Sequence, residues 1–311
     1  MPAGSVTLLE ASKCSSDPLK RGVVETIIQE SPILEMLPQM TIQGNALKHM
    51  EEGSLPTPTF RQVNATYSRS WGSDLEHFWG TTILGGEVFV DNYLVKVRGD
   101  VIDVKTKQYR KMGKAMARTF DKFFFDGTGT ANDFKGVNAL ISEGFGQITY
   151  AGANGGALTL EMLDESADLM RGQSSADVML LNRTQRRKIT ALGRTTGVGY
   201  PYLDVGTDTF GRQVTMWNGI PMRIIGDDKD GTAILGYDET RGSSDITSSI
   251  YLLALGEDDT TGLMGLGGSF DVKDFGETEA APGHLGRVEV YPGIAIFNQY
   301  SAVRIAGITN A

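Results

Sequence analysis

A long helical pattern between residues 97 and 137 constrains the fold of this chain most. The segment reads VRGDVIDVKTKQYRKMGKAMARTFDKFFFDGTGTANDFKGV and ends in a glycine-broken loop. When residues are placed every 100° around the helix axis, five basic side chains share one side, all within about 60° of Lys107: Lys107, Arg110, Lys111, Lys114 and Arg118. Five apolar side chains gather on the opposite side: Tyr109, Met112, Met116, Phe120 and Phe123. The pattern predicts a rigid helix of about 25–29 residues, roughly 40 Å long.

Taken alone, this pattern fits a helix that packs on the core and keeps its basic side in solvent. From Lys105 to Arg118 there are six basic residues and no acidic one, although the chain has a formal net charge of −9. The net charge argues against a protein covered in nucleic-acid-binding surface, but it leaves room for one local basic face.

The composition favours a folded protein with two lobes and excludes several other classes. With 311 residues and 40% hydrophobic content, the chain can bury a substantial core. The single Cys14 excludes an intramolecular disulfide and a cysteine-based zinc site. The first residues lack the pattern of a signal peptide. The sequence contains no run of about 18 apolar residues, which a membrane-spanning helix would need, so we expect no membrane partner.

Residues 1–45 predict an extended arm that contains one helix. Asp17-Pro18 is a good helix start, Val23, Ile27 and Ile28 have suitable spacing, and Ser31-Pro32 should end the helix. Residues 46–80 predict an exposed β-hairpin, since Pro56 and Pro58 discourage a helix. Six side chains here are candidate contacts to a partner: Phe60, Arg61, Tyr67, Trp71, Phe78 and Trp79. Alternatively, these rings close the loop onto its own domain.

A second lobe of alternating helices and strands is expected over residues 154–265. Thr159 should cap one helix, residues 176–181 (ADVMLL) read as a buried strand, and Asn182 or Thr184 should start a helix that Gly193 ends. Short strands are expected at residues 214–217, 222–225, 233–235 and 250–255. The strands after Gly286 should return to the lobe that holds the long helix, so that the α/β lobe is an insertion.

Motifs for catalysis, cofactors and metals are absent from the sequence. Gly127-Thr-Gly-Thr lacks the ending of a phosphate-binding loop and predicts a turn. GDDKDG (226–231) does not match a calcium loop and predicts a solvated hairpin turn. His49, His77 and His284 do not form a metal motif. We therefore predict no catalytic residue, no cofactor, no metal site and no enzymatic activity.

The order of these parts resembles the major capsid proteins of tailed bacteriophages (Caudoviricetes), which have the Hong Kong 97 fold. The resemblance covers nearly the whole chain and rests on four segments in sequence: FDKFFFDGTGTANDFKGV (120–137), ADVMLLNRTQRRKITAL (176–192), NGIPMRII (218–225) and GIAIFNQYSAVRI (293–305). It implies an α+β fold with an N-terminal arm (1–45), an extended loop (46–80), a peripheral domain with the spine helix (81–153 and 266–311) and an inserted α/β axial domain (154–265).

The resemblance also implies a function and a set of partners. The chain would self-assemble into pentamers and hexamers of an icosahedral shell that encloses double-stranded DNA. It would be a virion component assembled in the host cytoplasm, with a portal, a scaffolding protein and a decoration protein as further partners. The basic helix face would contact either DNA phosphates or acidic groups of neighbouring subunits, and the sequence leaves both open. An encapsulin-like compartment is an alternative, as is a non-assembling α/β enzyme or binding protein.

The founding member of this family carries a scaffolding segment before its arm. Here the arm begins close to Met1, so we expect a separate scaffolding protein or none.

The founding member also cross-links its subunits through a lysine of the extended loop, and this chain departs from that pattern. No lysine lies between Lys48 and Lys96, so the loop lacks the required nucleophile. Boiled shells should therefore dissociate into single-length chains on a denaturing gel. A ladder of covalent multimers would contradict this expectation.

Overall fold

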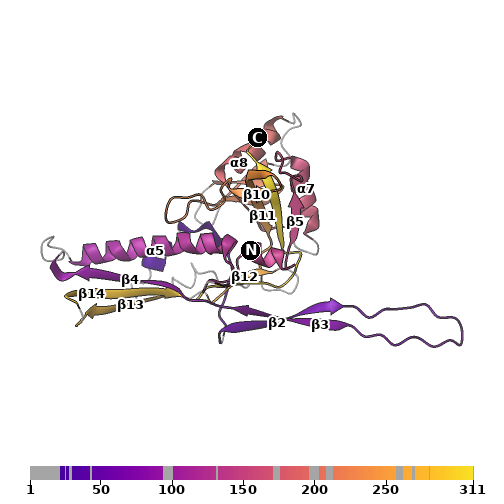
Figure 1. The fold of residues 1–311 in the computed structure, drawn as a ribbon, viewed down its shortest axis with the longest axis horizontal. Coiled ribbons are helices and arrows are strands. Elements are labelled where there is room, and N and C mark those ends of the chain that lie inside the picture. Colours follow the sequence, from indigo (N-terminus) through magenta and orange to yellow (C-terminus); the bar gives the residue numbers. More distant parts are fainter. Residues whose placement is uncertain are drawn as a thin grey trace.

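The computed structural model shows two lobes and a long hairpin that projects away from them (Figure 1). The structure describes residues 22–310 except residues 25, 28, 29, 43, 94–100, 131, 171–175, 196–202, 208–212, 257–261, 268, 269 and 280. Among the helices of the described ranges, none is both long enough and apolar enough to cross a membrane. The mixture of helices and strands confirms the expected α+β class.

The predicted rod is helix α5 (Val101–Asp126), and it lies along a three-stranded antiparallel sheet (Figure 1). The sheet has the order β13 (Asp271–Glu277), β14 (Gly283–Val290), β4 (Leu84–Asp91). The apolar face is confirmed, because Tyr109, Met116 and Phe120 are buried, and Met112 and Phe123 pack against the same core. Burial of this stripe fixes the helix on the sheet.

The arm packs against the other side of α5. Val23, Val24 and Ile27 are buried in its first helical residues, and a short helix α3 (Pro32–Met36) follows. Ser31-Pro32 therefore starts a helix as well as ending one, because the Ser31 hydroxyl accepts a hydrogen bond from the Leu34 amide at 3.1 Å. Asp17-Pro18 and Ile28 lie outside the described residues. Strand β1 (Gln39–Met40) then joins a small sheet in the order β1, β12 (Leu263–Leu266), β15 (Gly293–Ile296).

The expected hairpin is confirmed as β2 (Ala46–Ser54) paired with β3 (Ser73–Gly80). Residues 55–72 between them form an open loop without strand pairing, so Phe60 and Tyr67 lie in this loop and not in a ladder. Pro56 and Pro58 explain the difference, since neither can donate a ladder hydrogen bond.

The α/β lobe is built on an eight-stranded sheet with the order β5-β16-β11-β6-β9-β8-β7, and β10 pairs with β11. The strands are β5 (Gln147–Tyr150), β6 (Val178–Leu181), β7 (Leu203–Thr207), β8 (Gln213–Trp217), β9 (Ile220–Ile224), β10 (Glu239–Arg241), β11 (Ser244–Leu253) and β16 (Ala302–Thr309). The helices are α6 (Val137–Ser142), α7 (Leu160–Leu169) and α8 (Arg183–Thr195). The sheet is buried on both faces: Leu180 and Tyr251 belong to one core cluster, Met179 and Leu252 to the other.

Several local predictions for this lobe are confirmed and others are wrong. Thr159 caps α7, since its side chain accepts from the Met162 amide. Asn182, not Thr184, caps α8, because Asn182 and Gln185 exchange hydrogen bonds of 2.8 and 2.9 Å. Gly193 does not end α8, which continues to Thr195. Residues 233–235 form an isolated bridge and a turn, so the strand predicted there is wrong.

Two strands lie in a different lobe from the one that the sequence predicted for them. β14 and β15 lie in the lobe of α5, as expected, but β16 lies in the large sheet between β5 and β11. β5, placed with the peripheral domain by the sequence, pairs in parallel with β16. The near-continuous burial of β16 is typical of a central strand that is covered on both faces. The division into peripheral and axial domains stays a prediction.

Gly286 of β14 lies against Tyr109 of α5, and it offers a test of this packing. A Cβ atom at Gly286 would lie 1.5 Å from the Tyr109 hydroxyl. The substitution Gly286→Ala should therefore lower the free energy of unfolding by about 1–3 kcal/mol. Gly226→Ala is the matched control, because a Cβ there meets no atom within 4 Å. Equal stability of the two variants in urea unfolding would contradict this packing.

Candidate assembly surface

The loop of the hairpin exposes large apolar and aromatic side chains to solvent. Phe60 is fully exposed, Trp71 is 84% exposed and Tyr67 is 63% exposed. Arg61 contacts the loop itself, with its guanidinium 5.1 Å from the Tyr67 ring centre and hydrogen bonds to two loop carbonyls. Phe78 lies nearer the lobes but is also 66% exposed. Five of the six predicted contact residues are thus available to a partner.

Trp79 is the exception, and its prediction as a contact between subunits is wrong. The side chain is only 5% exposed, and its ring packs edge-on against Phe145 at 4.9 Å. Alternation along β2 and β3 points His77 and His49 to the same side, where they pack on Phe145 and Phe297 at 4.7 and 4.9 Å. For these residues the alternative holds: they fasten the base of the hairpin to its own chain.

The basic face of α5 divides into two halves. Lys114 forms an ion pair with Glu30 of the arm at 2.8 Å, and Arg118 lies 3.7 Å from the same carboxylate. These two cations therefore have partners within the chain, and neither DNA nor a neighbouring subunit is needed to explain them. Lys107, Arg110 and Lys111 are exposed and have no ion-pair partner in the part of the chain that the structure describes.

Two further polar contacts fix the arm, and the sequence did not indicate either. The Ser31 hydroxyl donates to the carboxylate of Asp121, which is buried on α5. Burial raises the pKa of Asp121 to about 8, and the hydrogen bond from Ser31 opposes part of the rise. Glu35 of α3 is buried and lies 3.4 Å from Arg223 of β9, which links the arm to the α/β lobe.

The C-terminal end of α5 and the loop after it hold the two lobes together. Lys122 forms an ion pair of 2.7 Å with Asp228 in the GDDKDG segment, and this contact lowers the pKa of Asp228. The segment is a turn, as predicted, but Asp228 is buried, so the solvated description is wrong for this residue. The glycine-rich loop is confirmed as turn structure, with a β-bridge between Thr128 and Lys135 and a hydrogen bond of 2.9 Å from the Gly136 amide to the Gly127 carbonyl.

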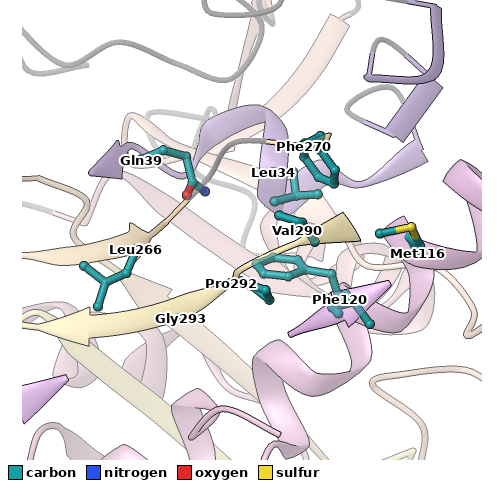
Figure 2. Close-up of a pocket in the computed structure, with 10 residues that line it drawn as sticks. Leu34, Gln39, Met116, Phe120, Leu266, Phe270, Val290, Pro292 and Gly293 are labelled. Carbon is teal, nitrogen blue, oxygen red and sulfur yellow. The ribbon is translucent and has the colours of Figure 1, made fainter. Parts of the chain in front are cut away.

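A small cavity lies where the arm meets the spine helix and the returning strands (Figure 2). Leu34 of α3, Met116 and Phe120 of α5, and Leu266 of β12 line it, together with other mostly apolar side chains. The space open to a water-sized sphere is about 10 Å³, which holds at most one water molecule. The cavity is a packing gap and has no room for a ligand. No group of three or more metal-ligating side chains occurs among the described residues.

Comparison with known proteins shows the fold and leaves residue roles open. No protein-family model matches the chain, and no curated protein matches it by sequence. The structure is similar to the holo-SrpI encapsulin complex from Synechococcus elongatus, with a TM-score of 0.65, 16% identity, and coverage of 90% of this chain and 88% of that one. It is also similar to the capsid of the native GTA particle (TM-score 0.61, 10% identity, coverage 90% and 91%).

A structure of Mycobacterium phage Bobi is a third neighbour, with a TM-score of 0.60, 9% identity, and coverage of 88% and 89%. The chain has the Hong Kong 97-like capsid fold. The fold predicted from the sequence is therefore confirmed. Because identities are this low, the capsid fold does not by itself assign a role to any residue, and the contacts described above must carry that argument.

The raised pKa of Asp121 predicts how stability depends on pH. An aspartate in the unfolded chain loses its proton near pH 4, whereas folded Asp121 keeps it to about pH 8. Stability should therefore fall as the pH rises through this window, by at most about 1.4 kcal/mol per pH unit. Asp121→Asn should remove this slope and raise the melting temperature most at pH 8.

Melting curves at pH 5 and pH 8 check this expectation, with the exposed Asp245→Asn as the matched control. If Asp121→Asn and the unsubstituted protein lose stability equally between the two pH values, the assignment of a buried neutral carboxyl is wrong.

Proposed function

We propose that this protein is the major capsid protein of a virus-type icosahedral shell that is built from pentamers and hexamers of the chain and encloses double-stranded DNA. The capsid fold over about 90% of the chain supports a shell-forming role. DNA as the content is supported by the phage and GTA structures among the neighbours. A portal, a scaffolding protein and a decoration protein are further partners in this proposal, and its location is the virion.

The observation that carries the proposal is the hairpin with its exposed aromatic loop. A single copy leaves Phe60, Trp71 and Leu55 in water, at the end of a ribbon whose base alone is fastened to the lobes. Exposed apolar groups of this size mark a binding surface. A second copy lying under the ribbon would bury them, and each chain would then both give and receive one hairpin. Many such contacts per subunit make a closed shell stable even where each is modest.

An encapsulin-like compartment is the second candidate, because the holo-SrpI encapsulin complex is among the similar structures. Such a shell would need a pocket near the arm for a cargo peptide. The cavity beside the arm has room for about one water molecule, and the side chains around it are packed. Among the described residues beside the arm, this gap is therefore too small to hold a cargo peptide.

Assembly and content can be tested separately. The purified protein should elute as megadalton particles, appear as closed shells by negative-stain microscopy, and protect DNA from added nuclease. The variant Phe60→Ser with Trp71→Ser should keep the fold, because both side chains are exposed, yet lose the particles. Ile246→Ser, which changes an exposed apolar residue of β11, is the matched control and should still assemble.

Each outcome points to a different conclusion. Monomers or small oligomers of the unsubstituted chain would overturn the shell-forming role. Shells that contain protein cargo and no protected DNA would favour the encapsulin-like alternative.

A further inference from the structure

Helix α8 of the α/β lobe carries a row of arginines along its exposed side. Arg183, Arg187 and Arg194 are all exposed, and they fall within about 40° of one another around the helix axis. The row is about 16 Å long. α8 contains no acidic residue, and the three arginines have no ion-pair partner in the part of the chain that the structure describes. This arginine row therefore presents concentrated positive charge to solvent.

Helix α7 of the same lobe carries the opposite charge in a similar arrangement. It contains no basic residue, and its four carboxylates are exposed and lie within about 60° of the first one: Glu161, Asp164, Glu165 and Asp168. None of these four forms an ion pair with another described residue. Partial burial and the charge of Asp168 raise the pKa of Asp164, as expected where like charges crowd on one helix face. The acidic row is thus left without neutralising charge.

Both rows point away from the core of the lobe. Leu163 and Ser166 of α7 are buried, and Gln185 and Ile189 of α8 are buried. On each helix the buried residues lie opposite the charged row, because they are about half a turn away from it. Leu163 and Ile189 belong to the same hydrophobic cluster, so packing fixes the direction in which each row points. Folding of one copy leaves both rows in water.

The two rows do not neutralise each other within one chain. α7 packs on β5 and β16, whereas α8 packs on β9, and β11 and β6 lie between these strands. Adjacent strands are about 4.8 Å apart, so the three steps from β16 to β9 separate the helices by about 14 Å. Figure 1 shows α8 and α7 at the two sides of the lobe. Neutralisation of the rows therefore requires a second molecule.

A second copy of the chain matches both rows at once, because every copy brings an acidic row for each arginine row. Glu161 and Glu165 are four residues apart, and so are Arg183 and Arg187. Two guanidinium–carboxylate pairs can therefore form side by side, about 6 Å apart along the helices. The planar guanidinium binds a carboxylate through two parallel hydrogen bonds, which fixes orientation as well as charge.

We propose that the arginine row of α8 binds the acidic row of α7 in a neighbouring copy, and that this contact joins successive subunits of each pentamer and hexamer. The contact is heterologous, because two different surfaces of the same chain meet, and such contacts close into rings. This inference rests on the proposed shell function and names the side chains that hold the α/β lobes of one ring together.

Cross-linking tests which helices meet. In a chain whose only cysteine is first removed by Cys14→Ser, Glu165→Cys with Arg187→Cys places one thiol in each row. A short bismaleimide should then give a ladder on a denaturing gel that ends at the pentamer and the hexamer. Glu165→Cys alone and Arg187→Cys alone are the matched controls. Each should remain a single chain, because thiols of the same kind do not meet in a heterologous contact.

Charge reversal tests whether the contact drives assembly. Arg183→Glu with Arg187→Glu should raise the protein concentration needed for half-maximal assembly by about tenfold or more, because the loss is repeated at every interface of a ring. Glu161→Arg with Glu165→Arg should do the same. The chain with all four changes keeps the formal net charge of −9 and should assemble again, since the pairs are restored in opposite orientation.

The readouts are sedimentation velocity at two salt concentrations and nuclease protection of DNA. Assembly of the unsubstituted chain should weaken as salt rises. Lys229→Glu with Lys273→Glu is the matched control, because it makes the same change in net charge at two exposed lysines of other elements. This control should assemble normally. All substituted side chains of the charge-reversal variants are exposed, and circular dichroism verifies that each variant is folded.

Four results would overturn the inference. If both charge-reversal variants assemble normally, or the control loses assembly equally, the pairing is wrong while the shell function stands. A ladder that stops at two chains would show a two-fold contact and no ring. If only the arginine variant is affected, and it forms shells without protected DNA, the arginine row binds phosphates of nucleic acid. If the unsubstituted chain does not assemble, the shell function fails and this inference fails with it.

Discussion

Close packing between the arm and the spine helix is the constraint on which the rest of the peripheral region depends. Gly113 and Ala117 form a row of small residues on α5, four residues apart, and both are buried. A Cβ at Gly113 would lie 3.1 Å from Ile27, so any larger residue would push the arm outward by a few tenths of an ångström. Met116 and Phe120 then reach the core that the arm shares with the three-stranded sheet. Arm, helix and returning strands are therefore one packed unit.

This packing also explains why one basic helix has two electrostatic roles. Where the arm covers α5, Glu30 satisfies Lys114 and Arg118, and Asp121 remains protonated beneath Ser31. A third charge on the arm, Glu35, reaches across to Arg223 of the α/β lobe. Beyond the arm, Lys105 pairs with Asp274 of β13, and Lys107, Arg110 and Lys111 are exposed and have no ion-pair partner among the described residues. Coverage by the arm therefore accounts for the pairing of Lys114 and Arg118.

The long helix, the hairpin, the α/β lobe and the overall fold could be predicted from the sequence, because each has a strong local pattern. The predictions that were wrong concern residues whose environment depends on contacts between distant segments. Trp79 looks like its exposed neighbours Trp71 and Phe78 in the sequence, and only the position of Phe145 buries it. Asp121 lies near the basic side of the helical wheel, so no periodicity reveals that the arm covers it. The four-residue spacing of Gly113 and Ala117 is a sequence signal for this close packing, and the sequence analysis missed it. The lobe predicted for β16 was wrong, because the partners of a strand depend on topology, which residue patterns do not specify.

The division between satisfied and unsatisfied charges fits a subunit that must be stable alone and yet associate reversibly. Ion pairs within the chain, such as Lys122 with buried Asp228, fix the lobes before any partner arrives. The exposed groups left over contribute little singly, since a surface pair is worth about 0–1 kcal/mol. A ring multiplies that small term by the number of its subunits. A weak contact lets a misplaced subunit dissociate, whereas closure of the ring engages all contacts together. The exposed aromatic loop adds apolar area that association can bury.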